Sequence, residues 1–291
     1  MGKRIWARSL PVIYFVLLVL IFPTISTAKE AKTSEKGVLR MGVFPIVSGV
    51  ALFKRFAPLK DYLSNELGRE MMLETARDFP TFVHRTAKHR YDIVITAPHF
   101  SVLAADSGDY RIVARPKRDL VSLIVVEKNS AITNLVQLAG KKIATPPVPA
   151  LTTRSSKKYL AGLGLTGNKQ PKYLAYKSHN AAYQATLNND TAAAIVSINA
   201  VNQALDRGIP LRVIGKVPPL PAMATLVSTK LPKKFALDVE KVLVSMDKTD
   251  KGRAVLKKVG FPGYWSARLK DYDSVRPYKP ASSNIGKSSK K

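Results

Sequence analysis

The sequence contains no cysteine. Disulfide bonds and thiolate metal sites are therefore excluded, and so is the lipidated cysteine that anchors an exported lipoprotein. Acidic residues are also scarce, with 20 Asp and Glu against 47 Lys and Arg. No Ser-His-Asp order, paired carboxylate set or metal-ligand spacing stands out along the chain. We therefore expect a protein that is not an enzyme and that uses no metal and no cofactor.

Long apolar runs are missing except near the N-terminus. There, three basic residues precede the apolar residues 10–22, and the small residues Ser26, Thr27 and Ala28 follow. The run is shorter than the roughly 20 apolar residues that span a bilayer. This pattern predicts a signal peptide over residues 1–28 and export to the periplasm, with an uncleaved membrane anchor as the alternative.

The chain is strongly basic, with a formal net charge of +27. A basic surface suits nucleic acid, anionic membranes or small anionic ligands. The export signal argues against nucleic acid, and no nucleic-acid-binding motif is present. Two interpretations stay open, namely a site for small anions and a charged surface suited to an unusual environment.

Strand and helix patterns alternate along the body of the chain. Short apolar runs predict strands at residues 38–44, 71–74, 91–96, 110–114, 120–127, 141–144, 172–176, 192–197, 211–214 and 224–228. Helical spacing separates most of them, as at residues 52–67 and 79–89. Such alternation predicts an α/β protein with mostly parallel sheets flanked by helices. Ligands of such sheets bind beyond the carboxyl ends of the strands, where Ser48, Thr96, His99, Ser197 and Asn199 stand.

A proline-rich loop at residues 145–150 leads from a predicted strand into a helix. The first turn of that helix carries Thr152 and Thr153. Helix N-termini present unpaired N–H groups and a partial positive charge, so they bind anions. The alternative is an ordinary helix cap, because Ser and Thr favour helix starts for that reason alone.

Several segments together resemble a known family. They are residues 42–45, 56–59, 91–99, 134–142 and 178–182, and their order and spacing are similar to those of periplasmic substrate-binding proteins of phosphate/phosphite/phosphonate ABC transporters. The resemblance extends over residues 39–272. It implies a monomeric protein that captures a small tetrahedral oxyanion, such as phosphate, phosphite or a simple phosphonate. The implied partner is an ABC permease in the inner membrane, or alternatively a sensor histidine kinase.

The resemblance also implies a type II periplasmic-binding-protein architecture with two lobes and a two-strand hinge. Lobe 1 would comprise residues 37–120 and 229–278, and lobe 2 residues 121–228. The strands at 120–127 and 224–228 are placed to be the hinge. Residues 29–36 would form a mobile arm, and residues 279–291 have the composition of a basic disordered tail.

In the family, a hydroxyl-rich turn that opens a helix holds the phosphonate group. It corresponds to Leu151, Thr152 and Thr153, although Ala150 and Leu151 replace the usual hydroxyl residues. Phe79 matches an aromatic position, without the hydroxyl of a tyrosine. The complete set of predicted ligand-binding residues is Ser48, Phe79, Thr96, His99, Leu151, Thr152, Thr153, His179, Asn180, Ser197 and Asn199.

Two features of this set bear on the choice of ligand. Family members that bind aminoalkylphosphonates hold the ammonium group with carboxylates, and those positions correspond to Asn180 and residues 197–199. An amide cannot neutralise a buried cation, so an aminophosphonate is disfavoured. His99 and His179 stand at predicted helix starts and are either donors to the oxyanion or capping histidines at the surface.

Overall fold

The computed structural model describes residues 37–147 and 150–279. The predicted signal peptide, the predicted arm and, apart from Lys279, the predicted tail lie outside the described residues. None of the helices within the described ranges is both long and apolar enough to cross a membrane.

The first sheet has six strands in the order β13-β4-β12-β3-β1-β2. Its strands are β1 (Leu39–Val43), β2 (Met71–Glu74), β3 (Ile93–Thr96), β4 (Tyr110–Pro116), β12 (Ala224–Ser228) and β13 (Tyr264–Ser266). The helices packed on it are α1 (Gly49–Leu67), α2 (Phe79–Ala87), α3 (Pro98–Asp106), α7 (Lys233–Ser245) and α8 (Asp250–Val259), with the 3-10 helices η3 (Met246–Lys248) and η4 (Leu269–Tyr278).

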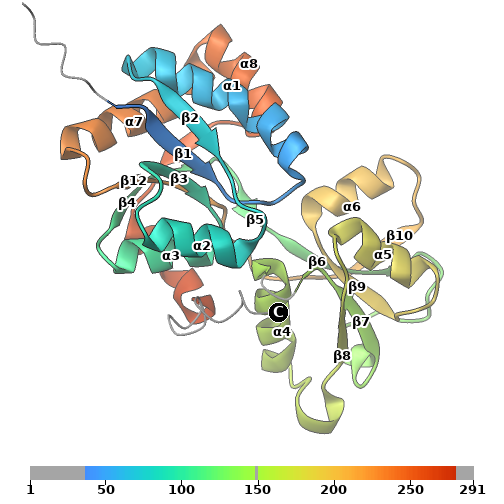
Figure 1. The fold of residues 1–291 in the computed structure, drawn as a ribbon. Coiled ribbons are helices and arrows are strands. Elements are labelled where there is room, and N and C mark those ends of the chain that lie inside the picture. The colour runs from blue at the N-terminus through green and yellow to red at the C-terminus, as the bar shows by residue number, and fades with distance from the viewer. Residues whose placement is uncertain (1–36, 148–149, 280–291) are drawn as a thin grey trace, which may run out of the picture. The chain divides into compact units, whose positions relative to one another are not determined.

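Both faces of this sheet are covered, because successive residues of its strands point to opposite faces. Ile93 and Ile95 join the core formed with α1, α7 and α8, while Val94 joins the core formed with α2, α3 and η4. On α1 the spacing of Leu52, Phe56, Leu59 and Leu63 places one apolar stripe against the sheet. Figure 1 shows α1 and α8 side by side over this face.

The second sheet has five strands in the order β10-β6-β9-β7-β8. They are β6 (Ser122–Glu127), β7 (Lys142–Thr145), β8 (Lys172–Ala175), β9 (Ala193–Ser197) and β10 (Leu211–Lys216). Its helices are α4 (Leu151–Gly162), α5 (His179–Leu187) and α6 (Ile198–Leu205), with the 3-10 helices η1 (Val136–Leu138) and η2 (Gly167–Lys169). The side chains of α5 and α6 fill the core on one face of the sheet, and Leu160 of α4 belongs to the core on the other.

The two-lobed α/β fold is confirmed, but the sheets are mixed rather than mostly parallel. In the first sheet β1 pairs in parallel with β2 and β3, whereas β12 runs antiparallel to β3 and β4. In the second sheet β7 pairs in parallel with its neighbours, whereas β6 runs antiparallel to β9 and β10. Parallel pairing needs a crossover connection within one sheet, and β6 and β12 instead receive the chain directly from the other sheet.

The chain passes between the sheets at two places. There β5 (Asp119–Leu120) pairs antiparallel with β11 (Leu220–Pro221) as a separate two-stranded ribbon. Strands β6 and β12 lie inside the two sheets, directly after this ribbon along the chain, and that residues 120–127 and 224–228 act as the hinge strands stays a prediction. Every residue of β12 and all but the last residue of β6 are buried.

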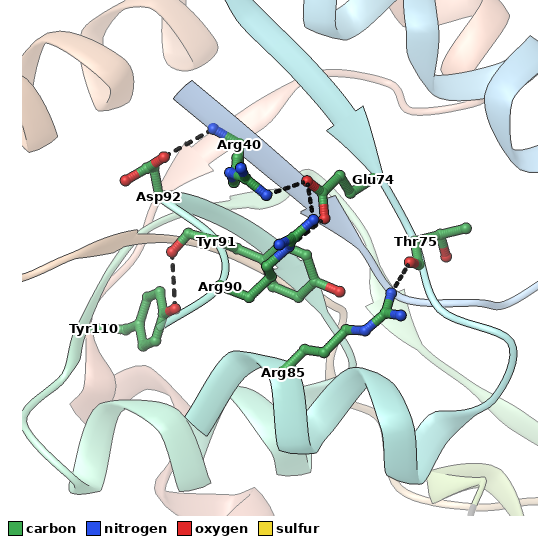
Figure 2. A network of polar contacts seen from close by, with 8 residues as sticks. All are labelled: Arg40, Glu74, Thr75, Arg85, Arg90, Tyr91, Asp92 and Tyr110. Carbon is green, nitrogen blue, oxygen red and sulfur yellow. Dashed lines mark hydrogen bonds and ion pairs between the residues drawn. The ribbon is translucent and has the colours of Figure 1, made fainter. Parts of the chain in front are cut away.

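The few acidic residues of the first sheet are occupied by structural contacts (Figure 2). Glu74 accepts from Arg90 at 2.9 and 3.2 Å and from Arg40 at 3.0 Å. Asp92 accepts the backbone N–H of Arg40 at 2.8 Å, which joins the loop before β3 to β1. Elsewhere Asp106 pairs with Arg276 and Lys279. Glu74 and Asp106 are therefore paired with basic side chains, and Asp92 is bound to the backbone.

Candidate functional site

The N-terminal ends of six helices line a cavity of about 680 Å³. The lining residues at those helix starts are Ser48 of α1, Phe79 of α2, Ala97, Pro98 and His99 of α3, Ala150, Leu151 and Thr152 of α4, Ser178 and His179 of α5, and Ser197, Ile198 and Asn199 of α6. Each of these helices follows a β-strand directly or after a short loop, so the helix starts gather beyond the carboxyl ends of the strands.

The helix starts give the cavity a positive electrostatic character. Each exposes N–H groups with no intrahelical acceptor and carries about half a positive charge. Side chains cap α2, α5 and α6, through Asp78, Ser178 and Ser197, while α1, α3 and α4 have no side-chain cap. None of the six helices carries an acidic residue in its first turn.

Charged side chains add to this field. Arg118 and Lys177 both line the cavity. Asp119 is the one carboxylate among the described lining residues, and it accepts from Arg115 at 2.7 Å. The cavity therefore presents cationic groups and N–H donors, and its single carboxylate is already paired.

Two neighbouring threonines at the start of α4 have different environments. Thr152 is 4 % exposed and lines the cavity. Thr153 is fully buried, and its hydroxyl donates to the carbonyl of Pro146 at 3.0 Å. Thr153 therefore holds the proline-rich loop against the helix, which leaves Thr152 as the hydroxyl available to a ligand.

We expect Thr152→Val to weaken anion binding about ten- to a hundredfold, because a hydrogen bond to a charged group contributes about 1.5–3 kcal/mol. Thr153→Val is the matched control. It should lower the free energy of unfolding by about 1 kcal/mol through the lost bond to the loop, with a smaller effect on affinity. Calorimetric titration and melting curves of both variants check this, and normal affinity in Thr152→Val would contradict it.

His179 is held as a neutral donor. The backbone N–H of Ser197 donates to its Nδ1 at 3.1 Å, so in the neutral ring the proton resides on Nε2. Burial lowers the pKa of His179 from 6.5 to about 4. At neutral pH the imidazole therefore supplies one N–H donor and no charge.

An aromatic wall forms one side of the cavity. Phe44 and Phe79 line the cavity, and their rings stack with centroids 4.4 Å apart. The ring of Phe100, which is outside this lining, lies 5.5 Å from that of Phe44. His99 is 1 % exposed, and its ring lies 4.0 Å from that of Phe100. The cavity therefore joins a polar, positive side made by helix starts to an apolar side.

A comparison with known protein families decides what kind of protein this is. The profile of the family described as "ABC transporter, phosphonate, periplasmic substrate-binding protein" matches residues 41–272. The chain belongs to this family. The resemblance noted from the sequence is therefore confirmed, and the family is one of transport components that bind substrates rather than of enzymes.

Solved structures of similar fold support the same architecture. PhnD1 from Prochlorococcus marinus in complex with methylphosphonate has a TM-score of 0.71 and 18 % identity, covering 83 % of this chain and 96 % of that one. A Xanthomonas citri protein bound to ATP has a TM-score of 0.70 and 17 % identity, covering 84 % and 99 %. A binding protein component of an ABC phosphonate transporter from Pseudomonas aeruginosa has a TM-score of 0.68 and 16 % identity, covering 84 % and 85 %. These likenesses confirm the type II periplasmic binding fold.

For this phosphonate-family protein, the cavity brings together eight of the predicted ligand-binding residues: Ser48, Phe79, His99, Leu151, Thr152, His179, Ser197 and Asn199. Three others lie elsewhere. Thr153 contacts the proline loop, Asn180 is exposed outside the cavity lining, and Thr96 lines a different cavity between α2 and α3. That any of these residues contacts the ligand stays a prediction.

Several residues that line the cavity were not predicted from the sequence. Arg118 stands between two strands in a segment without any motif, and only the β5–β11 ribbon brings it to the cavity. Lys177 and Ser178 directly precede His179, so the helix start that predicted His179 could have included them. Phe44 directly follows β1, so the rule that ligands bind beyond the carboxyl ends of strands could have predicted it.

Proposed function

We propose that this protein captures a small phosphorus oxyanion, namely phosphate, phosphite or a simple phosphonate, in the cavity between the six helix starts. The observation that supports this most strongly is the set of six helix N-termini around one cavity with no acidic residue in any first turn. Such termini bind tetrahedral oxyanions through backbone N–H groups and the helix dipole. Thr152 and the Nε2 of His179 add donors that carry no charge.

The aromatic wall favours a phosphonate within this group of ligands. A phosphonate carries a carbon substituent, which can lie against Phe44 and Phe79, whereas phosphate and phosphite offer no apolar part. Burying that substituent stabilises the complex by about 25 cal/mol for each Å² of apolar surface removed from water. The PhnD1 structure from Prochlorococcus marinus holds methylphosphonate, which is a ligand of this kind.

We further propose that the chain is exported to the periplasm by residues 1–28 and delivers its ligand, as a monomer, to an ABC permease in the inner membrane. Binding proteins of this architecture close their lobes around a ligand by a hinge motion. The β5–β11 ribbon is the part of the described chain where such bending is concentrated, because it belongs to neither large sheet.

The ligand class is tested by a thermal-shift and calorimetry series with phosphate, phosphite, methylphosphonate, 2-aminoethylphosphonate and sulfate. We expect methylphosphonate to stabilise the protein more than 2-aminoethylphosphonate does. The cavity offers the ammonium group only Asp119, which is paired with Arg115, and an unpaired buried cation costs several kcal/mol. At about 100 times its dissociation constant, a ligand raises the free energy of unfolding by about 2.7 kcal/mol. A clear preference for the aminophosphonate would contradict this.

A further inference from the structure

A second cavity of about 580 Å³ adjoins the first. Ile46, Arg118, Asn199 and Met223 line both, so the two cavities share a boundary. Arg55 lines only the second cavity. No carboxylate belongs to its lining in the described ranges. The second cavity is therefore also cationic, and its lining meets that of the first.

Two arginines are fixed at this place by the C-terminus of α8. The Nε of Arg55 donates to the carbonyl of Val259 at 2.6 Å, and Nη1 of Arg118 donates to the carbonyl of Gly260 at 3.1 Å. Both guanidinium groups lie over the ring of Phe261, 5.8 and 4.9 Å from its centroid. Their positions are therefore determined before any ligand arrives.

These contacts leave the two positive charges without a carboxylate partner. Neither arginine forms an ion pair with any residue in ranges 37–147 and 150–279. Each is half-buried, and burial together with the charge of Arg55 lowers the pKa of Arg118 below its usual value. Two like charges held close together without counter-charge repel each other, and an anion placed between them removes that repulsion.

A purely structural role explains only part of this arrangement. Cations are favourable at a helix C-terminus, and each arginine satisfies one carbonyl at the end of α8. A guanidinium has five N–H donors, however, so most donors of Arg55 and Arg118 are not used by these bonds. Arginine also binds carboxylate and phosphate groups with two parallel hydrogen bonds, a geometry that one backbone carbonyl cannot supply.

Helix α6 lines the other side of this cavity. Asn199, Asn202 and Gln203 all line it. Residues three and four apart on a helix share one face, so this face of α6 presents amide groups to the cavity. Amides donate hydrogen bonds without adding a negative charge, which suits an anion that the arginines also contact.

We propose that Arg55, Arg118 and the amide face of α6 form a subsite for a second anionic group of the same solute. The solute is then a phosphonate whose carbon substituent ends in a carboxylate or a further phosphorus oxyanion. This inference depends on the proposed function, because it assumes that the phosphonate group occupies the first cavity. The shared boundary at Arg118 is what allows one molecule to reach both places.

The test compares methylphosphonate with phosphonoacetate, 3-phosphonopropionate and 4-phosphonobutyrate by calorimetric titration. The three carboxylates vary the spacing between the two anionic groups. The wild-type protein should bind the best of them about ten- to a hundredfold more tightly than methylphosphonate, the range expected for hydrogen bonds between charged groups. Arg55→Gln should remove most of that advantage and leave methylphosphonate affinity within about twofold.

Arg69→Gln is the matched control. Arg69 also lies over a phenylalanine, 5.8 Å from the ring centroid of Phe235, and donates to a backbone carbonyl, but it lines neither cavity. Arg69→Gln should leave the affinity for each of these ligands unchanged. Melting curves of both variants separate lost binding from lost stability.

Two results would overturn the subsite while leaving the proposed function intact. One is equal affinity of the wild-type protein for methylphosphonate and all three carboxylates. The other is that sulfate stabilises the wild-type protein but not Arg55→Gln, while the carboxylates bind no more tightly than methylphosphonate. The arginines would then hold a free anion and not a second group of the solute. If neither methylphosphonate nor the carboxylates bind, the proposed function itself fails.

Discussion

Ser197→Asp is expected to weaken oxyanion binding about a thousandfold while the fold is retained. Ser197 caps α6 by accepting from the N–H of Ala200, and Asp is an equally good cap. The new carboxylate would stand in the cavity lining. Two unit charges about 4 Å apart in an effective dielectric of about 20 interact by about 4 kcal/mol, so an oxyanion there would lose about three orders of magnitude in affinity.

Thr249→Asp provides the control for this prediction. Thr249 caps α8 by accepting from the N–H of Gly252 at 3.0 Å, it is exposed, and it lies outside the binding cavity. The substitution introduces the same charge at the same kind of position, so it should leave affinity nearly unchanged. Calorimetric titration with methylphosphonate and phosphate checks both variants. Equal affinity of Ser197→Asp and the wild-type protein would place the anion elsewhere.

Stability in acid is expected to depend on His179. Its pKa in the folded protein is about 4, against 6.5 for the ordinary side chain, because burial disfavours the charged ring. Above pH 6.5 the ring is neutral in both states and contributes no pH dependence. As the pH falls from 6.5 to 4 the unfolded chain takes up a proton that the folded protein does not, so stability is lost.

The loss should amount to about 3 kcal/mol by pH 4, at 1.36 kcal/mol for each unit of pKa difference. His179→Gln retains a side-chain acceptor for the N–H of Ser197 but cannot titrate. Urea unfolding at several pH values should therefore show a shallower decline below pH 6.5 in the variant. Protonation of carboxylates affects both proteins alike and cancels in the difference. If the free energy of unfolding fell with pH equally in both proteins, His179 would not be the source of the loss.

The basic composition and the binding site are connected. The cavity contains a single carboxylate, which is paired with Arg115, and Glu74 and Asp106 are each bound to two basic side chains. An oxyanion that enters therefore meets no unpaired carboxylate among the described lining residues. The net charge of +27 attracts anions towards the protein, while the selectivity that we propose would come from the cavity itself.

The sequence by itself determined the class of protein and predicted the place of the candidate site. Apolar strands alternating with amphipathic helices predicted the α/β fold, because burial on both faces of a sheet leaves a clear pattern in the residues. The rule that ligands bind beyond strand ends then predicted Ser48, Thr96, His99, Ser197 and Asn199, and all of these except Thr96 line the cavity. These inferences depend only on local pattern and chain order, which a sequence contains in full.

Tertiary structure decided which side chains of each helix start face the cavity. Thr152 and Thr153 are adjacent and chemically identical, yet Thr152 lines the cavity while the hydroxyl of Thr153 donates to the proline loop. Thr96 likewise lines the separate cavity between α2 and α3, and not the cavity at the six helix starts. Arg55 and Arg118 come together only because both pack on Phe261, which arrives from the far end of the chain. Side-chain direction and long-range packing follow from contacts between distant segments, so no local pattern records them.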